Sequence, residues 1–255
     1  MNDSQLVSVS RIRQIISLID LTNLNDDCDR AAIEKLCQQA ESPAGYVAAL
    51  CVWPAFVLDA KKLLKPDSPL EIATVVNFPT GDEPLKTTCE SIDKALEDGA
   101  DEIDYVLPYT ELINGNSDKV AHAVGVVRRQ IPDNRTLKVI LETGMLENSD
   151  LIRAAADIAI DQGTDFIKTS TGKVPVNATR TAATIMLDAI AHSNKNVGFK
   201  AAGGIKTLED ANLYLKIAEE QMGQSWPTAR HFRFGASGLL QNALGNLDSA
   251  TPGQL

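Results

Sequence analysis

The chain is organised around one stretch, Asp165-Phe166-Ile167-Lys168-Thr169-Ser170-Thr171-Gly172-Lys173. This stretch places a lysine at the end of a short apolar run, and a glycine loop rich in hydroxyl groups follows at once. Side chains alternate between the two faces of a strand, so Lys168 points either into the interior of a sheet or barrel or to its rim. Because a buried charge is costly, the plainest interpretation is a strand-end lysine that reaches water.

Two further lysines favour a different interpretation. Lys138 opens the apolar run of residues 138–141, and Lys200 lies in Gly198-Phe199-Lys200-Ala201-Ala202-Gly203-Gly204. Both segments have the composition of strands and are flanked by turn residues. An acidic strand that contains Asp104 precedes them. Lysines on three successive predicted strands indicate one pocket assembled from strand ends, as in barrel enzymes.

The rest of the chain alternates between predicted strands and helices. Strands are predicted at residues 15–20, 45–52, 71–76, 102–106, 136–141, 166–168, 198–201 and 232–235. Helices are predicted at residues 4–17, 28–40, 55–64, 87–98, 117–130, 148–162, 177–191, 207–222 and 237–247, and a polar tail follows. The boundary between the first helix and the first strand stays open.

Short connections between these elements imply parallel strand pairing, and no linker rich in Pro, Gly or Ser divides the chain. We therefore predict an α/β fold in which residues 1–255 form a single-domain (β/α)8 TIM barrel, with a short N-terminal helix and a polar C-terminal tail. An open doubly wound sheet is the alternative.

Composition excludes several classes of protein. The net charge is −10 and no block of basic residues occurs, which disfavours a nucleic-acid partner or an anionic membrane surface. The four cysteines show no C-x-x-C spacing and are expected to be reduced thiols. The N-terminus lacks the regions of a signal peptide, and no run reaches the length of a membrane span. We expect a cytoplasmic protein with no membrane partner; the sequence leaves monomer and homodimer open.

Several familiar signatures fail on spacing. Gly172-Lys173 is followed by valine, where a P-loop requires Ser or Thr. Residues 235–239 lack the second glycine of a nucleophile elbow. His122, His192 and His231 are far apart in the sequence, so we expect them to be surface or packing residues. The sequence therefore predicts no metal and no cofactor.

Three late strands are followed by glycine together with a hydroxyl or cationic residue. Glycine lets backbone amides approach a ligand closely, and loops at this end of a barrel hold phosphate. Any one of these motifs is explained as well by turn geometry. Together they predict a phosphate site, for which the candidate residues are Thr171, Gly172, Lys173, Gly203, Gly204, Lys206, Gly235 and Ser237.

These motifs closely resemble those of the deoxyribose-phosphate aldolase family. The resemblance is carried by residues 99–104, 165–173, 198–204 and 233–237, and it covers nearly the whole chain. It implies a class I aldolase that reversibly cleaves 2-deoxy-D-ribose 5-phosphate into D-glyceraldehyde 3-phosphate and acetaldehyde. The reaction of this family passes through a lysine Schiff base and needs no metal.

The resemblance also implies roles for individual residues. Lys168 matches the Schiff-base lysine, Lys200 the second active-site lysine and Asp104 the acid/base partner, while Lys138 matches a further active-site lysine. Asp20, Thr22 and Cys51 complete the candidate substrate contacts. For Cys51, a packed thiol explains the sequence at least as well.

The chemistry requires an amine without its proton. A lysine with the reference pKa of about 10.4 is neutral in only about one molecule in 2500 at pH 7. A second ammonium about 4 Å away contributes about 4 kcal/mol at an effective dielectric near 20, or about three pKa units. Lys200 is therefore expected to activate Lys168 almost by itself. A carboxylate beside Lys168 would oppose this, so Asp104 is expected to pair more closely with Lys200 and to shuttle protons with water.

Two alternatives stay open. Another Schiff-base barrel, such as a transaldolase or a different phosphosugar aldolase, would use the same lysine. A catalytically silent barrel would use these lysines only as charges that bind a sugar phosphate. The products formed from several donor aldehydes and ketones test the first alternative, and a covalent adduct tests the second.

Overall fold

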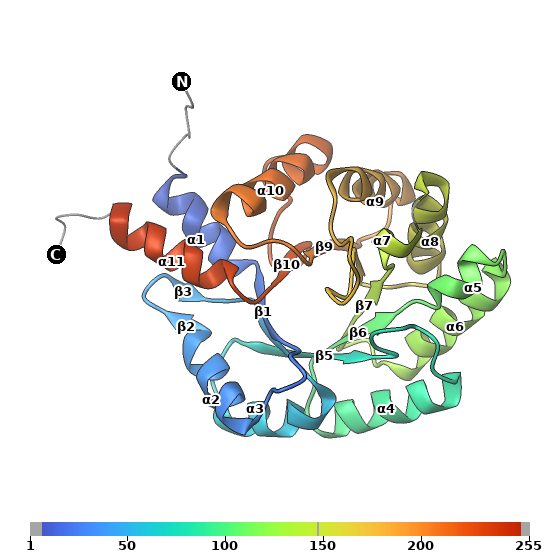
Figure 1. Ribbon diagram of the computed structural model, residues 1–255, viewed down its shortest axis with the longest axis horizontal. Coiled ribbons are helices and arrows are strands. Elements are labelled where there is room, and N and C mark those ends of the chain that lie inside the picture. Colours follow the sequence, from blue (N-terminus) through green and yellow to red (C-terminus); the bar gives the residue numbers. More distant parts are fainter. Residues whose placement is uncertain (1–6, 147, 251–255) are drawn as a thin grey trace.

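The computed structural model describes residues 7–146 and 148–250 and forms a closed barrel (Figure 1). Eight strands pair in the order β1-β10-β9-β8-β7-β6-β5-β4, and every pairing is parallel. β1 pairs with both β10 and β4, so the sheet has no free edge. The predicted barrel is confirmed, and the open doubly wound sheet is excluded.

The barrel strands are β1 Ile19–Asn23, β4 Ala49–Val52, β5 Glu71–Val76, β6 Glu102–Val106, β7 Thr136–Ile140, β8 Phe166–Lys168, β9 Gly198–Ala202 and β10 Phe232–Ala236. The helices are α1 Val9–Ser17, α2 Arg30–Gln39, α3 Val57–Leu63, α4 Leu85–Glu97, α5 Tyr109–Ile113, α6 Ser117–Gln130, α7 Thr143–Leu146, α8 Ser149–Asp161, α9 Arg180–Ser193, α10 Leu208–Met222 and α11 Leu239–Ala250. A 3₁₀ turn, Pro54–Phe56, precedes α3, and β2 Glu41–Ser42 pairs with β3 Gly45–Tyr46 outside the barrel.

The start of the chain differs from the prediction. α1 begins later than expected, and residues 4–6 lie outside the described part of the chain. Ile15, which was predicted to open the first strand, belongs to α1 because it forms one buried helical face with Ile12 and Ile16. β1 therefore begins at Ile19.

Three other predictions are corrected by the structure. The strand predicted at residues 45–52 is split into β3 and β4, because β3 turns away to form a hairpin with β2. The short helices α5 and α7 were not predicted, since five and four residues are too few to show a helical period. α11 continues to Ala250, beyond the predicted end at residue 247, and residues 251–255 of the predicted tail lie outside the described part.

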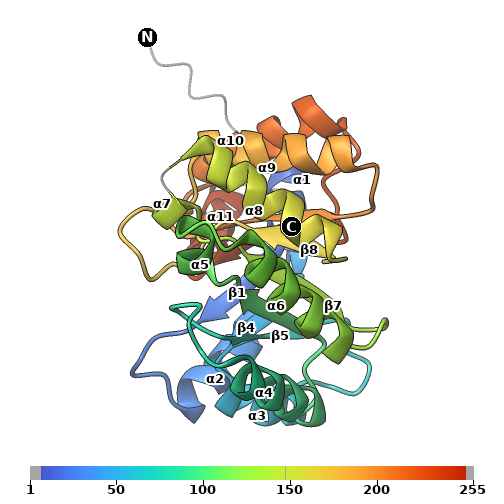
Figure 2. The same cartoon turned by 90° about the vertical axis from the view of Figure 1, so that its right-hand side faces the viewer.

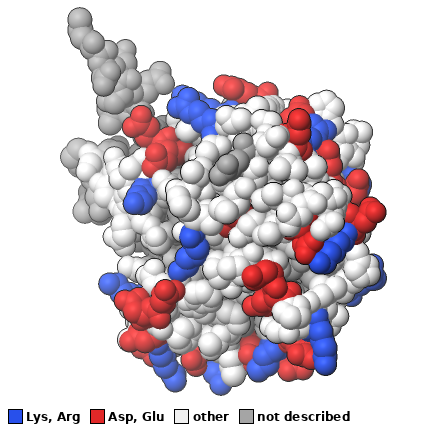
Figure 3. Space-filling model, turned by 45° about the vertical axis from the view of Figure 1, so that its right-hand side comes forward, with Lys and Arg blue, Asp and Glu red and all other residues white. Residues whose placement is uncertain are grey.

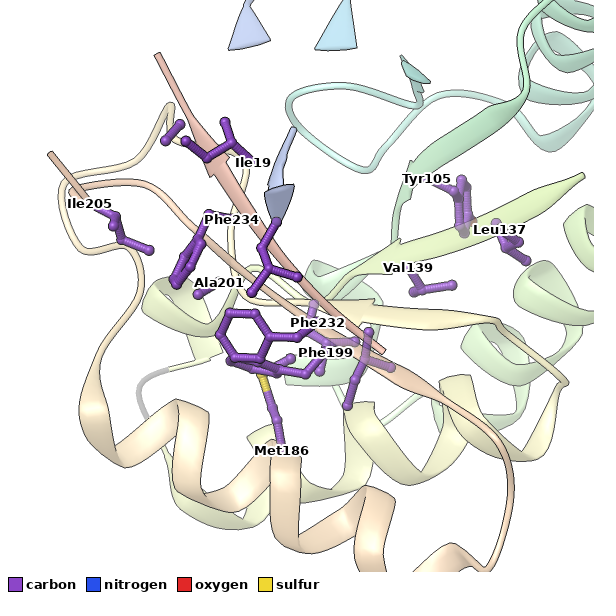
Figure 4. Close-up of a cluster of buried hydrophobic side chains, with 14 of the residues drawn as sticks. Ile19, Tyr105, Leu137, Val139, Met186, Phe199, Ala201, Ile205, Phe232 and Phe234 are labelled. Atoms are coloured by element: carbon purple, nitrogen blue, oxygen red, sulfur yellow. The ribbon is translucent and has the colours of Figure 1, made fainter. Parts of the chain in front are cut away.

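Apolar side chains on the outer faces of the strands pack against the helices. Figure 4 shows Phe199, Phe232 and Phe234 gathered beside Met186 of α9. The rings of Phe232 and Phe234 meet edge to face, with 4.8 Å between their centroids. Figure 2 shows helices α6 and α8 next to each other on the outside of the barrel. Because side chains alternate along a strand, the residues between these outward phenylalanines point into the barrel.

The outer surface carries charges of both signs. On the face shown in Figure 3, basic and acidic side chains are interspersed. Within residues 7–146 and 148–250, no helix has the length and apolar character needed to cross a membrane.

Candidate active site

The barrel interior holds a set of charged side chains where most such barrels hold apolar ones. Strand alternation explains their direction: Phe199 and Ala201 of β9 face the helices, so Lys200 between them faces inward. None of the set is more than 6% exposed. Its members are Asp20 of β1, Glu102 and Asp104 of β6, Lys138 of β7, Lys168 of β8, Lys200 of β9 and Arg233 of β10.

Six of these side chains form a closed ring in which positive and negative charges alternate, and we call it the charge ring. Arg233 pairs with Glu102 at 3.0 Å, Glu102 with Lys138, Lys138 with Asp104 at 3.0 Å, Asp104 with Lys200 at 2.8 Å, Lys200 with Asp20 at 2.5 Å, and Asp20 with Arg233 at 2.6 Å. Three carboxylates balance three cations, so the ring is neutral as a whole.

Lys168 joins the charge ring from outside at a single point. Its Nζ donates a hydrogen bond of 2.8 Å to Asp104 Oδ2, and Lys200 Nζ donates one of the same length to the same oxygen. The prediction that Asp104 pairs more closely with Lys200 is therefore wrong. Lys168 and Lys200 are register partners on neighbouring strands, so both amines reach the same carboxylate.

The environment of Lys168 favours its neutral form. Burial lowers the pKa of Lys168, Lys200 lowers it further, and Asp104 acts in the opposite direction. Burial is the largest of these causes, which corrects the expectation that Lys200 activates Lys168 almost by itself. Lys200 itself stays charged: burial acts to lower its pKa, but Asp104 and Asp20 outweigh burial and raise it.

Asp104 is held as a carboxylate. Burial alone would raise its pKa, but Lys138, Lys168 and Lys200 keep it well below its usual value. The arrangement thus places a permanent anion and a permanent cation beside one amine that gives up its proton readily.

The other interior candidates lie close to this cluster. Cys51 is fully buried and packs with Ala73 and Val75, and burial raises the pKa of its thiol. The hydroxyl of Thr22 donates a 2.8 Å hydrogen bond to the Asp20 carbonyl. For Cys51, the structure agrees with the packed thiol and places it at the wall of the candidate site.

The loop after β8 crosses the open end of the barrel. Lys173 Nζ lies 3.3 Å from the Asp26 carboxylate, after β1, and 5.7 Å from the ring centroid of Trp53, after β4. β4 and β8 are on opposite sides of the barrel. At its base the loop is held by Glu142, which accepts hydrogen bonds from the amide and the hydroxyl of Thr171. Lys173 therefore spans the entrance to the interior.

Glycines allow the late loops to lie close together. Gly203 has φ +85°, and a Cβ there would come within 2.6 Å of Asn177 in the loop after β8. The loops after β8 and β9 are thus in contact, and Gly172, Gly204, Lys206 and Ser237 are exposed at the same end of the barrel. At Gly235, a Cβ would lie 2.8 Å from Cβ of Ala202 and 3.1 Å from Cε of Lys200. The glycine therefore makes room for both side chains.

The sequence interpretation missed three residues of this site. Glu102 lies two positions before Asp104 on one strand, so strand alternation already puts both on the inner face. Arg233 is the register partner of Lys200 and lies two positions before Gly235. Glu142 gave no signal, because it follows the end of β7 in a left-handed backbone conformation with φ +54°.

The histidines lie apart from the interior. His192 contacts Asp188, and His231 contacts Asn196. Within residues 7–146 and 148–250, no group of three or more His, Cys, Asp or Glu side chains is arranged to hold a metal ion.

A closed parallel barrel with buried lysines around one carboxylate defines a class of protein, the barrel aldolases. The chain belongs to the DeoC/LacD family of aldolases, whose family model matches residues 14–241.

The relatives of the chain agree with this family. The chain is 51% identical over 237 residues to a deoxyribose-phosphate aldolase of Agrobacterium fabrum, a match that covers 93% of this chain and 92% of that protein. A candidate deoxyribose-phosphate aldolase of Coccidioides immitis has a TM-score of 0.80 and 27% identity, covering 90% of this chain and 85% of the other. The tetrameric deoxyribose phosphate aldolase of Aeropyrum pernix shares the fold, with a TM-score of 0.75 and 21% identity over 98% of this chain and 100% of that one.

Proposed function

We propose that the chain is a deoxyribose-phosphate aldolase that cleaves 2-deoxy-D-ribose 5-phosphate into D-glyceraldehyde 3-phosphate and acetaldehyde through a Schiff base on Lys168. The observation that carries the role of Lys168 is its position: a buried amine of lowered pKa that shares one oxygen of Asp104 with the charged Lys200. The activity is also that of the relative with 51% identity.

The geometry supports a sequence of proton transfers around one amine. The neutral Lys168 attacks the substrate aldehyde, and Asp104 with water carries one proton from the Lys168 nitrogen to the aldehyde oxygen, which gives the carbinolamine. A second proton, delivered from water, lets the carbinolamine hydroxyl depart as water. The resulting iminium accepts the electron pair of the C2–C3 bond as the C3 hydroxyl gives its proton to a water molecule, which releases D-glyceraldehyde 3-phosphate. The enamine then takes a proton at C2, and water releases acetaldehyde from Lys168.

Borohydride reduction in the presence of acetaldehyde tests the Schiff base directly. We expect a two-carbon adduct in the intact mass, located by peptide mapping on Lys168. The adduct should be absent from Lys168→Leu and retained in Lys86→Leu, a control lysine on the exposed face of α4. A folded protein with no adduct at all would favour the silent sugar-phosphate binder. An adduct formed with dihydroxyacetone in place of acetaldehyde would favour a transaldolase.

The phosphate of the substrate must be met by local positive charge, because the chain as a whole carries −10. We assign this role to Lys173, Lys206 and the amides of the glycine loops. Lys173 is paired with Asp26 across the entrance, so substrate has to displace that exposed ion pair.

Lys206→Ala is expected to raise KM by about tenfold and to leave kcat within about twofold, because a charged contact to a non-reacting phosphate contributes mainly to binding. Steady-state kinetics with deoxyribose phosphate measure both constants, and Lys86→Ala serves as the surface control. An unchanged KM with a collapsed kcat would contradict the assignment.

We propose a single-domain enzyme of the cytoplasm whose partners are the sugar phosphate and acetaldehyde. The four cysteines are free thiols, in keeping with a reducing compartment. Light scattering on the purified chain distinguishes monomer from homodimer.

A further inference from the structure

Glu102 and Arg233 lie on the side of the charge ring away from Lys168. Glu102 contacts Lys138 and Arg233, and Arg233 contacts Glu102 and Asp20; neither contacts Lys168 within ion-pair distance. Both are buried, with exposures of 2% and 6%. The Arg233 guanidinium is also fixed by a hydrogen bond to the Ala229 carbonyl and lies 5.6 Å from the ring centroid of Phe166. The mechanism above uses neither residue.

We propose that Glu102 and Arg233 are positioning residues that keep the charge ring neutral and thereby set how readily Lys168 loses its proton. This inference rests on the proposed role of Lys168. The ring already contains three cations for its three carboxylates, so a protonated Lys168 would add an unbalanced positive charge to the ring. A neutral Lys168 removes that imbalance.

Other charged and titratable groups face Lys168 from several strands. Asp104 comes from β6, Lys200 from β9 and the Cys51 thiol from β4, and Glu142 follows β7. Burial raises the pKa of Cys51, which keeps the thiol neutral. Glu142 is hydrogen-bonded to Thr171 and belongs to no ion pair of the ring. These groups stay the same when Glu102 or Arg233 is changed, so a comparison of variants isolates the balance of the ring.

Charge balance predicts opposite effects for the two residues. Arg233→Met removes a cation and leaves the ring at −1, so Lys168 should hold its proton to higher pH. Glu102→Gln removes an anion and leaves the ring at +1, so Lys168 should lose its proton at lower pH. A unit charge on the order of 10 Å away, at an effective dielectric of about 20, corresponds to a shift of about one pH unit. The double variant restores neutrality and should return toward the unaltered protein.

The experiment measures the titration of Lys168 in two ways. Trace labelling with acetic anhydride from pH 5 to 10, followed by peptide mapping, reports the neutral fraction of Lys168 without any aldolase chemistry. The rate of acetaldehyde trapping by cyanoborohydride over the same range reports imine formation. Four proteins are compared: the unaltered chain, Glu102→Gln, Arg233→Met and the double variant. Arg233→Lys keeps the charge and serves as the control for shape.

The expected result is a midpoint for Lys168 about one pH unit higher in Arg233→Met and about one unit lower in Glu102→Gln. The midpoints of Lys168 in the double variant and in Arg233→Lys should lie between those of the two single variants. If both single variants lose rate at every pH while the midpoint of Lys168 does not move, the inference is overturned and the role of both residues is purely structural. Shifts of the same sign in both would overturn it as well.

A wrong proposed function gives a different result from a wrong inference about the charge ring. In the first case the unaltered chain forms no acetaldehyde adduct on Lys168, while acetic anhydride still reports the midpoints and tests the ring. Breaking a buried ion pair is strongly destabilising, so the experiment also provides for a single variant that does not fold. Either single variant, compared with the double variant, still tests the inference. The midpoint of Lys168 must move in the single variant and return in the double variant. If neither single variant folds, Arg233→Lys and Glu102→Asp test the inference instead. Both keep the charge of the side chain, so the midpoint of Lys168 should not move, and a moved midpoint in either variant overturns the inference.

Discussion

Lys200→Met is expected to lower turnover at neutral pH by at least about 10²-fold, and raising the pH should recover part of the loss. An ammonium about 5 Å from another contributes about 3 kcal/mol at an effective dielectric near 20, which is about two pKa units. Lys200 and Lys168 both donate to Asp104 Oδ2 at 2.8 Å, so they are neighbours at such a separation. Without Lys200, Lys168 keeps its proton to higher pH.

The sign of the pH effect follows from the direction of each pKa. In the unaltered chain, burial and Lys200 lower the pKa of Lys168, so a larger fraction of the amine is neutral at a given pH than for an ordinary lysine. In Lys200→Met the contribution of Lys200 is lost, the pKa of Lys168 rises, and the acidic limb of the rate profile moves to higher pH. The fall in rate is therefore largest below the new midpoint and shrinks above it.

Profiles of kcat and of kcat/KM against pH measure this result. Lys195→Met is the matched control, because Lys195 is a surface lysine paired with Asp161 at the opposite end of β9. Circular dichroism and denaturant unfolding show whether the barrel persists. A loss of the same size at every pH would mean that Lys200 acts in proton transfer and not on the basicity of Lys168.

The sequence predicts the barrel well because every strand and helix repeats the same local pattern. Eight apolar runs, each followed by a helical period, fit one fold, and closure is confirmed by the pairing of β1 with β10 and β4. The errors fall where local patterns are weakest, as at α5 and α7, and where two patterns overlap, as at Ile15.

The site was predictable residue by residue but not as a network. Lys168, Lys200 and Lys138 were recognised because lysine inside an apolar run is unusual. Their pairing depends on register across neighbouring strands, and no single strand contains that information. For this reason the prediction that Asp104 pairs more closely with Lys200 is wrong, and the sequence did not reveal that Arg233 belongs to the charge ring. The importance of burial for Lys168 likewise emerges only when the interior is assembled.

Asp104→Asn is expected to lower turnover by about 10³-fold at every pH, a loss within the range found for groups that transfer protons. The effect on Lys168 itself has the opposite sign from that of Lys200→Met. Asp104 acts to raise the pKa of Lys168, so its removal lets the amine lose its proton at lower pH. The nucleophile should therefore be at least as available, while the later steps lose the carboxylate that moves protons.

Three lysine amines surround the position of Asp104, from Lys138, Lys168 and Lys200, and those of Lys138 and Lys200 are charged. An amide in place of the carboxylate leaves them with one anion fewer, and breaking buried pairs of this kind costs about 3–5 kcal/mol in the free energy of unfolding. Denaturant unfolding should show a loss of this order. Loss of the Lys168 proton relieves part of this repulsion, which reinforces the expected shift of Lys168 toward its neutral form.

Acetaldehyde trapping and turnover, measured on the same sample of Asp104→Asn, separate the two roles of the carboxylate. We expect turnover to collapse while trapping by cyanoborohydride continues, with its acidic limb moved to lower pH. Asp161→Asn, on the outer surface, is the control. If trapping falls in parallel with turnover, Asp104 is needed for the attack of Lys168 itself. If both are retained, the proton carrier of this barrel is another group, and the shared hydrogen bonds of Lys168 and Lys200 to Asp104 serve only to hold the amines in place.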